Sequence, residues 1–291
     1  MEYFMQMLVG GLSTGSVYAL GAIGFVLIYK ASGVLNFAQG ELMMVGAYFA
    51  YYPIVGWQMP FALGVMIALA LAALFGLLLN TLIFQRMIDE SILSVIMITI
   101  GLASFLRSVT GFFVVGLGET TIPSPVGDAV IDFGGVTVWQ LHLWVILVTV
   151  LLFGFFSLFF RHTSLGIGMR AAAENQQVAQ LMGISIKVSF GLSLVIATVV
   201  AAIGGIFSAQ LSYVGPEMYL VGLKALPAAF LGGIDSIPGA ILGGLILGVV
   251  ESLTGGFISG GAKEVVAFLM LFLILLIKPH GLFGTKEIKR V

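Results

Sequence analysis

The sequence has no cysteine and little charge. Only 9% of its 291 residues are charged, the net charge is -1, and the three histidines, His142, His162 and His280, are far apart. Without cysteine the chain forms no disulfide and no thiolate metal site, and the scattered histidines suggest no metal cluster. The charge balance also provides no basic surface for a nucleic acid. We therefore expect no metal, no cofactor and no nucleic-acid partner.

Apolar residues, by contrast, make up 60% of the chain. A water-soluble domain cannot bury so large a share in one core, so membrane lipid must cover part of it. The apolar runs are long and continuous, unlike the short alternating strands of a membrane barrel. The sequence predicts an all-α polytopic transmembrane helix bundle, a single transmembrane domain over 1–291, with roughly eight to ten membrane segments, some of them broken or re-entrant.

The predicted spans follow from the length that a helix needs to cross the bilayer, about 20 residues. They lie at 8–29, 37–52, 61–84, 92–115, 138–160, 188–211 and 265–277. The first apolar run, 4–29, has no basic region before it and is too long for a signal peptide, so we expect it to remain as a span. A Gly-rich stretch at 220–253 is expected to enter the membrane and turn back around 232–239 as two short or broken helices.

The placement of charge predicts the orientation. Lysine and arginine gather at one set of span ends and loops, namely Lys30, Arg86, Arg161, Arg170, Lys187, Lys278, Lys286, Lys289 and Arg290. Of the loops on the other side, only the one with Lys263 carries a cation, and the loop at 116–137 carries Glu119, Asp128 and Asp132 without a cation. Cytoplasmic loops are enriched in Lys and Arg. We expect a protein of the cell inner membrane with its N-terminus outside and its C-terminus in the cytoplasm.

Two stretches of the chain resemble each other: LNFAQGELMMVGA at 35–47 and IDSIPGAILGGLI at 234–246. Each places an Asn or Asp four residues before a Gly and then runs into an apolar helix. Because Asn and Asp cap helices, and amides at a helix start carry partial positive charge, these turns could meet a carboxylate in a pore. They could equally be capping turns of a duplicated scaffold. The candidate pathway residues are Asn36, Gln39, Gly40, Glu41, Asp235, Ser236, Pro238 and Gly239.

The glycines of these turns are expected to exclude any side chain. Gly40 and Gly239 would permit either a positive φ or the close approach of a neighbouring helix. Pro238 suits the first turn of a helix, where its missing amide hydrogen is not needed.

The segment 161–187 is the longest loop on the side rich in cations. Its middle, 169–184, favours a helix that stops at Gly183. Glu174, Asn175, Gln176, Gln177 and Gln180 would form a polar side, and Ala171, Ala172, Val178, Leu181 and Met182 an apolar one. Such a helix lies outside the bilayer and either docks on a partner or rests on the lipid surface.

A few charged residues fall inside or near apolar spans. Arg107 lies in the outer part of its span, where it would snorkel to the interface or pair with a carboxylate. We expect the same of Lys224, Glu217 and Glu251, near the outer ends of their segments. Glycine pairs, Gly11/Gly15, Gly239/Gly243 and Gly244/Gly248, predict close helix packing. No GxxxxGK[ST] nucleotide loop occurs in the chain, so ATP hydrolysis would need a partner.

Three motifs together resemble one known family. GVLNFAQGELMMVGAY (33–48), RAAAENQQVAQLMGI (170–184) and AAFLGGIDSIPGAILGGLILGVVES (228–252) are similar to the LivH-type permeases of branched-chain amino-acid ABC importers. They are distributed over nearly the whole chain, in the family's order and at its spacing. The resemblance implies a transport subunit, not an enzyme, that translocates leucine, isoleucine or valine received from a solute-binding protein.

The resemblance also implies partners: a homologous second permease, two cytoplasmic ATPase subunits, and a periplasmic or surface-tethered solute-binding protein. In the family the cytoplasmic loop helix docks on the ATPase, and Arg170, Ala173, Glu174 and Gly183 correspond to that coupling segment. Asn175 and Gln176 depart from the acidic residue and proline that often follow the glutamate. ATP-driven closure of the ATPase dimer would then move this helix and rock the permease halves.

Other transport classes remain possible at this point. Importers of urea or short-chain amides use similar permeases. A passive channel also uses paired half-helices but needs no docking helix, and a secondary transporter would more often carry a carboxylate well inside a span. The spans show no constellation of catalytic residues, so an enzyme is not expected.

Overall fold

The computed structural model describes residues 2–87, 90–113, 120–127, 129–133, 136–174 and 176–284. Its elements in chain order are α1 (Glu2–Ser32), α2 (Gln39–Tyr51), η1 (Tyr52–Gly56), α3 (Phe61–Leu82), η2 (Phe84–Met87), α4 (Ile92–Phe113), β1 (Val130–Phe133), β2 (Val136–Trp139), α5 (Gln140–His162), α6 (Ser164–Glu174), α7 (Gln176–Leu181), α8 (Ile186–Leu211), η3 (Pro216–Met218), α9 (Tyr219–Gly232), α10 (Ile237–Phe257) and α11 (Gly260–Ile277). Within this described part, 7 helices are long and apolar enough to cross a membrane: α1, α3, α4, α5, α8, α10 and α11. With the shorter α2 and α9 between them, the predicted all-α membrane bundle is confirmed.

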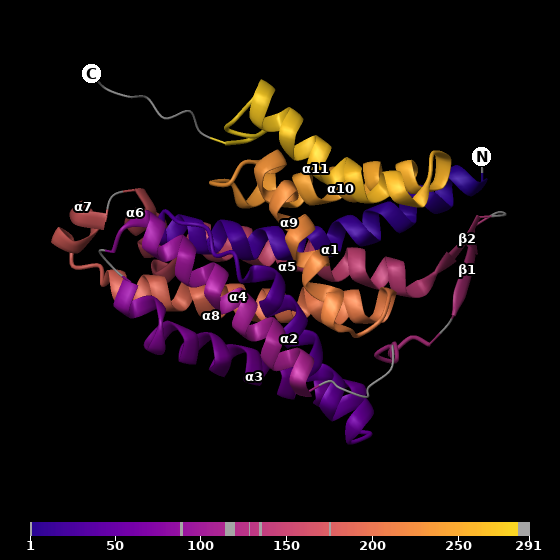
Figure 1. Ribbon diagram of the computed structural model, residues 1–291, viewed down its shortest axis with the longest axis horizontal. Helices are drawn as coiled ribbons and strands as arrows, with labels where there is room; N and C mark the ends of the chain where they lie inside the picture. Colours follow the sequence, from indigo (N-terminus) through magenta and orange to yellow (C-terminus); the bar gives the residue numbers. More distant parts are fainter. Residues whose placement is uncertain are drawn as a thin grey trace.

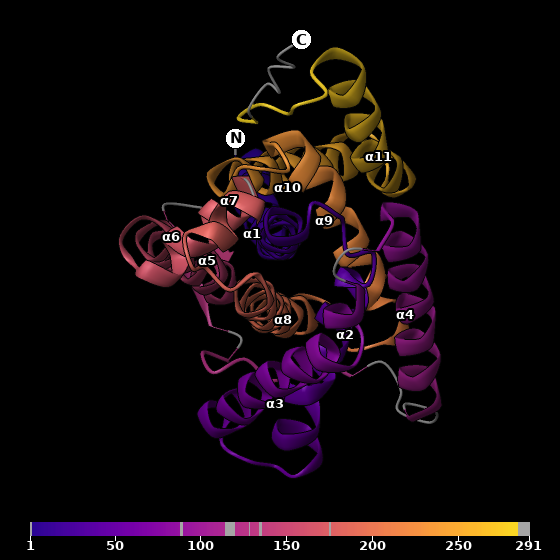
Figure 2. The same ribbon diagram turned by 90° about the vertical axis from the view of Figure 1, so that its left-hand side faces the viewer.

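Helix α1 is the central element of the bundle. Figure 2 shows it end-on, surrounded by α5, α8, α9 and α10. The most apolar stretch of α1 is 89% buried, whereas that of α11 is only 6% buried. A Cβ atom added at Gly15 would lie 2.7 Å from the carbonyl oxygen of Gly244, and one at Gly11 would lie 2.8 Å from the Cα of Val249. The predicted small-residue faces therefore let α1 and α10 approach backbone to backbone.

The outer helices turn apolar side chains away from the bundle. Met66 of α3, Phe105 of α4, Leu151 of α5 and Leu276 of α11 are all exposed. So many exposed apolar side chains on a soluble protein would make it aggregate, but here they form the surface that lipid covers.

The two ends of the bundle differ. Figure 1 shows the N-terminus and the β1–β2 hairpin at one end, and α6 and α7 at the other. Helices α1, α3 and α5 finish at the α6–α7 end, and α8 and α10 run back toward the hairpin end. The cations in the last turns of α1 and α5, and the one that follows α3, therefore lie at the α6–α7 end.

Two predicted membrane segments differ in length from the structure. Helix α2 has 13 residues, a rise of about 20 Å, which is too short to cross a hydrocarbon core of about 30 Å. Helix α10 has 21 residues and reaches Phe257, so the prediction of two short or broken helices in 220–253 is correct only for α9, with 14 residues. Glycine lowers helix propensity, but in α10 the glycines pack against α1 and α9, and this packing outweighs the propensity.

The loop at 116–137 contains a hairpin that the sequence analysis did not predict. Strands β1 and β2 pair antiparallel, with Val130 opposite Trp139 and Phe133 opposite Val136. The predicted span therefore begins at Gln140 instead of at 138. The strands are short runs of β-branched and aromatic residues, which favour a pleated conformation. Glu119, Asp128, Asn175, Lys286, Lys289 and Arg290 lie outside the described residues.

Candidate translocation and coupling sites

The chain between α1 and α2 folds back into the bundle and forms the first candidate turn. Asn36 is 1% exposed, and its Oδ1 accepts a hydrogen bond of 3.1 Å from the backbone N–H of Ala38. The residue before α2 is Ala38, which has no side-chain acceptor. The expected capping role of Asn36 is thus wrong: its side chain closes a tight turn before the helix instead, as Asn often does.

Gln39 and Gly40 fix the start of α2 against three other helices. The buried Gln39 side chain lies against Gly24 of α1 and reaches the carbonyl oxygen of Ala197 in α8 at 3.5 Å. A Cβ atom at Gly40 would be 2.6 Å from the carbonyl oxygen of Tyr219. Because Gly40 lies inside a helix, its requirement is close approach to α9 and not a positive φ.

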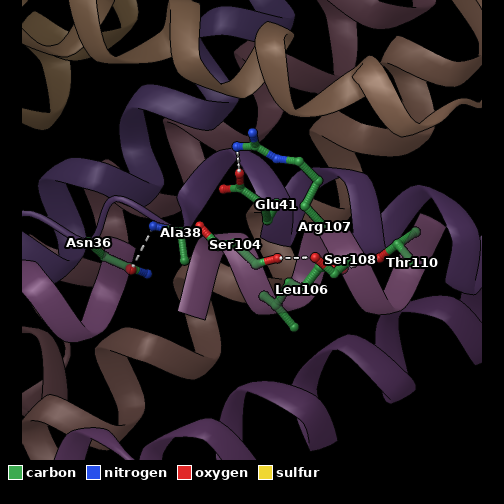
Figure 3. Close-up of polar contacts among 8 residues, drawn as sticks. All are labelled: Asn36, Ala38, Glu41, Ser104, Leu106, Arg107, Ser108 and Thr110. Atoms are coloured by element: carbon green, nitrogen blue, oxygen red, sulfur yellow. Dashed lines mark hydrogen bonds and ion pairs between the residues drawn. The ribbon is translucent and has the colours of Figure 1, made fainter. Parts of the chain in front are cut away.

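Glu41 and Arg107 form an ion pair within the membrane-spanning part of the bundle (Figure 3). Arg107 Nη2 donates to Glu41 Oε1 at 2.6 Å, and its guanidinium lies 3.4 Å from the centre of the Tyr219 ring. The Glu41 side chain is 3% exposed and that of Arg107 is 43% exposed. Of the two predicted alternatives for Arg107, pairing is therefore the correct one. The pair and the ring contact join α2, α4 and α9.

The second candidate turn, 233–236, joins α9 to α10. The cap of α10 is Ser236, whose Oγ accepts a hydrogen bond of 3.1 Å from the N–H of Gly239, so the expected capping role of Asp235 is wrong. Pro238 stands in the first turn, as predicted. Gly239 packs directly on the backbone of Gly232, the last residue of α9.

A segment after α11 covers this second turn. The N–H groups of Leu282 and Phe283 donate to the carbonyl oxygens of Leu231 and Gly232, both at 2.9 Å. These carbonyls at the end of α9 would otherwise lack a partner. The turn is thereby tied to the end of α11.

The structure does not bring the two turns together. Gly40 packs on α9 near Tyr219 and Gly222, and Gly239 packs on Gly232, which is ten residues or about 15 Å further along the same helix. Both Asp235 and Arg170 of α6 lie within electrostatic range of Lys30 at the end of α1. The second turn therefore belongs to the α6–α7 end of the bundle.

The predicted coupling segment is helical on both sides of residue 175, as α6 (Ser164–Glu174) and α7 (Gln176–Leu181), and the helix begins at Ser164 instead of at 169. Met169 and Ala172 are buried, so Ala172 packs within the chain and is not available to a partner. Gly183 has a φ of +82° and ends the segment, as predicted. All four predicted coupling residues are exposed: Arg170, Ala173, Glu174 and Gly183.

The coupling segment also exposes large apolar side chains. Leu181 is 87% exposed and Met182 is 77% exposed. Leu181 is the last residue of α7 and Met182 comes directly after it, at the end of the bundle where Lys30 and Arg170 lie. An apolar pair of this kind is suited either to a protein partner or to a lipid surface.

The structure contains a second ion pair, around Lys224, whose residues were expected either to snorkel or to pair. Lys224 Nζ lies 2.7 Å from Glu251 Oε1 and 2.8 Å from Glu264 Oε2. Glu264 was not predicted at all, and Glu217 is exposed in η3. The sequence held a signal: α2, α4, α9 and α10 each contain a single charged residue. Lone charges of opposite sign in separate spans are expected to pair.

Comparison with known proteins places this bundle in a family. Residues 7–276 match the family described as "Branched-chain amino acid transport system / permease component". The chain belongs to this branched-chain amino acid permease family. It is 33% identical over 309 residues to the "High-affinity branched-chain amino acid transport system permease protein LivH" of Escherichia coli (strain K12), covering 99% of this chain and 98% of that protein.

Other relatives show the same extent of similarity. The permease protein BraD of Pseudomonas aeruginosa is 34% identical over 307 residues, covering 99% of this chain and 98% of the relative. A probable LivH protein of Methanocaldococcus jannaschii is 26% identical over 307 residues, covering 98% and 95%. As a member of the permease family with 7 candidate spans, the chain is a multi-pass inner-membrane protein.

Proposed function

We propose that this chain is the permease subunit of an ATP-driven importer that translocates branched-chain amino acids. The observation that carries the proposal is the family match, which extends over the whole membrane bundle and is shared by relatives named as branched-chain amino acid permeases. The chain contains no GxxxxGK[ST] loop, so the energy of ATP must reach it from another subunit.

The partners in this proposal are two cytoplasmic ATPase subunits, a homologous second permease and a solute-binding protein. The exposed residues Arg170, Ala173, Glu174 and Gly183 form the ATPase-coupling surface, extended by Leu181 and Met182. Asp235 and Arg170 each lie within electrostatic range of Lys30 at the end of α1, and through this group a movement of α6 is proposed to reach the turn between α9 and α10. A rigid-body displacement of this kind is the usual way in which domain closure opens a pathway.

The proposed orientation puts the α6–α7 end in the cytoplasm and the hairpin end outside, with the N-terminus outside. Lys30, Arg86, Arg161 and Lys187 support it because they belong to helix ends or short helices at the α6–α7 end. Cytoplasmic ends carry the excess of Lys and Arg.

A cysteine-free chain allows a direct test of the orientation. Ser124→Cys, between α4 and β1, should react with an impermeant thiol reagent in intact cells, and Ser164→Cys, the first residue of α6, should react only after lysis. Labelling of position 164 but not 124 in intact cells would reverse the orientation.

The pathway in this proposal passes the start of α2. Asn36, Gln39, Gly40 and Glu41 lie there between α1, α8 and α9, and polar atoms of Asn36 and Gln39 have no hydrogen-bond partner among the described residues. Buried polar atoms without partners are rare, and a pathway that admits water or a polar substrate would supply partners. At the other turn, Asp235, Ser236, Pro238 and Gly239 are proposed to transmit motion from α6, since they lie at that end.

One observation favours a second candidate function, secondary transport. Glu41 and Glu251 are buried carboxylates within membrane helices, and proton-driven carriers use such groups. Each is paired with a cation, which favours a structural role. Permeases for urea or short-chain amides remain alternatives for the substrate, and a passive channel remains an alternative for the mechanism.

The experiment that separates these functions is purification in mild detergent followed by uptake in liposomes. An importer subunit will co-purify with ATPase chains and a second permease, and its uptake of leucine will need ATP and the binding protein. Uptake that follows a proton gradient without ATP would establish a secondary transporter, and uptake of urea instead of leucine would change the substrate.

A further inference from the structure

A charged cluster lies inside the bundle at a place that the proposed coupling and pathway residues do not use. Lys224 of α9 contacts Glu251 of α10 and Glu264 of α11 through the same ammonium group. One lysine between two glutamates gives the cluster a net charge of -1 when all three groups are ionised. The lysine joins α9 to both α10 and α11, and the second carboxylate leaves an excess negative charge in the cluster.

The Glu251 carboxylate interacts with Lys224 and with the Tyr18 hydroxyl of α1, but one of its oxygens has no close donor. Its side chain is fully buried, and its Oε2 has no hydrogen-bond partner closer than 3.5 Å among the described residues. A buried carboxylate oxygen without a close donor is costly, because the water it has lost is not fully replaced. The cost is removed if a cationic donor enters beside it.

Two cavities meet at this cluster. One, of about 400 Å³, is lined by Lys224 and Glu264, and the other, of about 390 Å³, is lined by Glu251. Thr14 and Lys263 line both. The walls of the larger cavity come from α1, the last turn of α8 and the first two turns of α9 and α11, so the cavity lies toward the hairpin end. The size of both cavities matches that of small-molecule sites.

The lining of the larger cavity combines the groups that an α-amino acid needs. The excess carboxylate charge suits an ammonium group, and Lys263 with the hydroxyl groups of Ser212 and Tyr213 can receive a carboxylate. Leu211 and Val221 provide an apolar wall for a branched side chain. The two ends of a zwitterion and its side chain therefore each have a suitable neighbour.

We propose that the Lys224–Glu251–Glu264 cluster and the cavities beside it form an entry site for a zwitterionic α-amino acid, whose ammonium group binds the two carboxylates. This inference rests on the proposed function, since it names the place in the permease that receives the substrate from outside. Its essential chemical requirement is a free ammonium group on the ligand.

The test uses single cysteines in the assembled complex reconstituted in liposomes. Ser212→Cys places a thiol in the wall of the cavity, with Leu220→Cys as a second position, and Gly56→Cys, in η1 at the same end of the bundle, is the control. Leucine should slow modification of the cavity thiols by the factor 1 + [L]/Kd, about 11-fold at ten times Kd, and leave position 56 unaffected. 4-Methylpentanoate, which lacks the ammonium group, should give no protection.

Glu264→Gln tests the role of the charge. Its side chain is 64% exposed, so the change should not prevent folding, and it should abolish protection by leucine, whereas Glu264→Asp should retain part of it. Glu90→Gln, a matched change at the α6–α7 end, should leave protection unchanged.

Two results would overturn the inference: equal modification of the cavity thiols with and without saturating leucine, or equal protection by 4-methylpentanoate. Uptake by the same liposomes is measured in parallel with ATP and the binding protein. If leucine is imported without protecting the thiols, the entry site is wrong and the proposed function stands. If leucine is not imported, the proposed function itself fails.

Discussion

Replacing either member of the Glu41–Arg107 pair should lower the free energy of unfolding, but by different amounts. Arg107→Met leaves the Glu41 carboxylate 3% exposed and without its cation, and an uncompensated buried charge costs about 3–5 kcal/mol. Glu41→Leu leaves Arg107, which is 43% exposed and still contacts the Tyr219 ring, so the loss should be roughly 1.5 kcal/mol, that of one charged hydrogen bond. Removing arginine should therefore destabilise the protein more than removing glutamate.

The double variant provides the decisive comparison. With both charges replaced by apolar side chains of similar size, no buried charge remains, and the protein should be more stable than Arg107→Met alone. The assay is equilibrium unfolding of the purified protein in mixed micelles with increasing dodecyl sulfate, followed by circular dichroism. If the two single effects add in the double variant, or if Glu41→Leu is the more damaging change, the assignment of a buried, coupled pair is wrong.

Further predictions concern helix packing, the turn and the coupling surface. Gly15→Leu should prevent accumulation of the folded protein, because its Cβ would lie 2.7 Å from the α10 backbone, whereas Gly10→Leu, with no atom within 4 Å of its Cβ, should accumulate normally. Immunoblots of membranes measure the amount of each variant, and equal amounts would contradict this prediction. Gly239→Leu should abolish uptake per assembled complex, because the added side chain meets the backbone of Gly232 and shifts α9 relative to α10, whereas Gly56→Leu should transport normally. Normal uptake by Gly239→Leu would show that this turn does not transmit motion. Leu181→Asp should reduce ATP-dependent uptake at least about 10-fold, the effect of losing about 1.4 kcal/mol of docking energy, with insertion unchanged; full coupling in purified complexes would assign this surface to lipid.

The membrane bundle and its close helix contacts were predictable because their signals are local. A run of about 20 apolar residues specifies a span, and glycines four residues apart specify a face that admits a neighbouring helix. Gly11 and Gly15 did not identify α10 as their partner, because the same spacing occurs at several places in the chain. Only the packed structure selects Gly244 and Gly248.

The partners of the charged residues could not be predicted from the local sequence. That Arg107 would pair or snorkel followed from its position in a span, but the choice of Glu41 over Glu251 depends on which helices are neighbours. Glu264 was missed because it stands in the second turn of α11, just before its predicted span, where a charge is ordinary. The two turns were predicted as a pair from their similarity, yet their depth depends on tertiary contacts. Gly239 is fixed near the α6–α7 end by α9 and by the segment after α11.

The central claim, that the chain is a permease powered by ATPase partners, is tested most directly by leucine uptake into liposomes containing the co-purified complex. With the solute-binding protein outside and ATP inside, uptake should exceed that without ATP, and Leu181→Asp should remove the difference while the complex stays assembled. Uptake of the same rate without ATP, or purification of the chain without any ATPase subunit, would contradict the account.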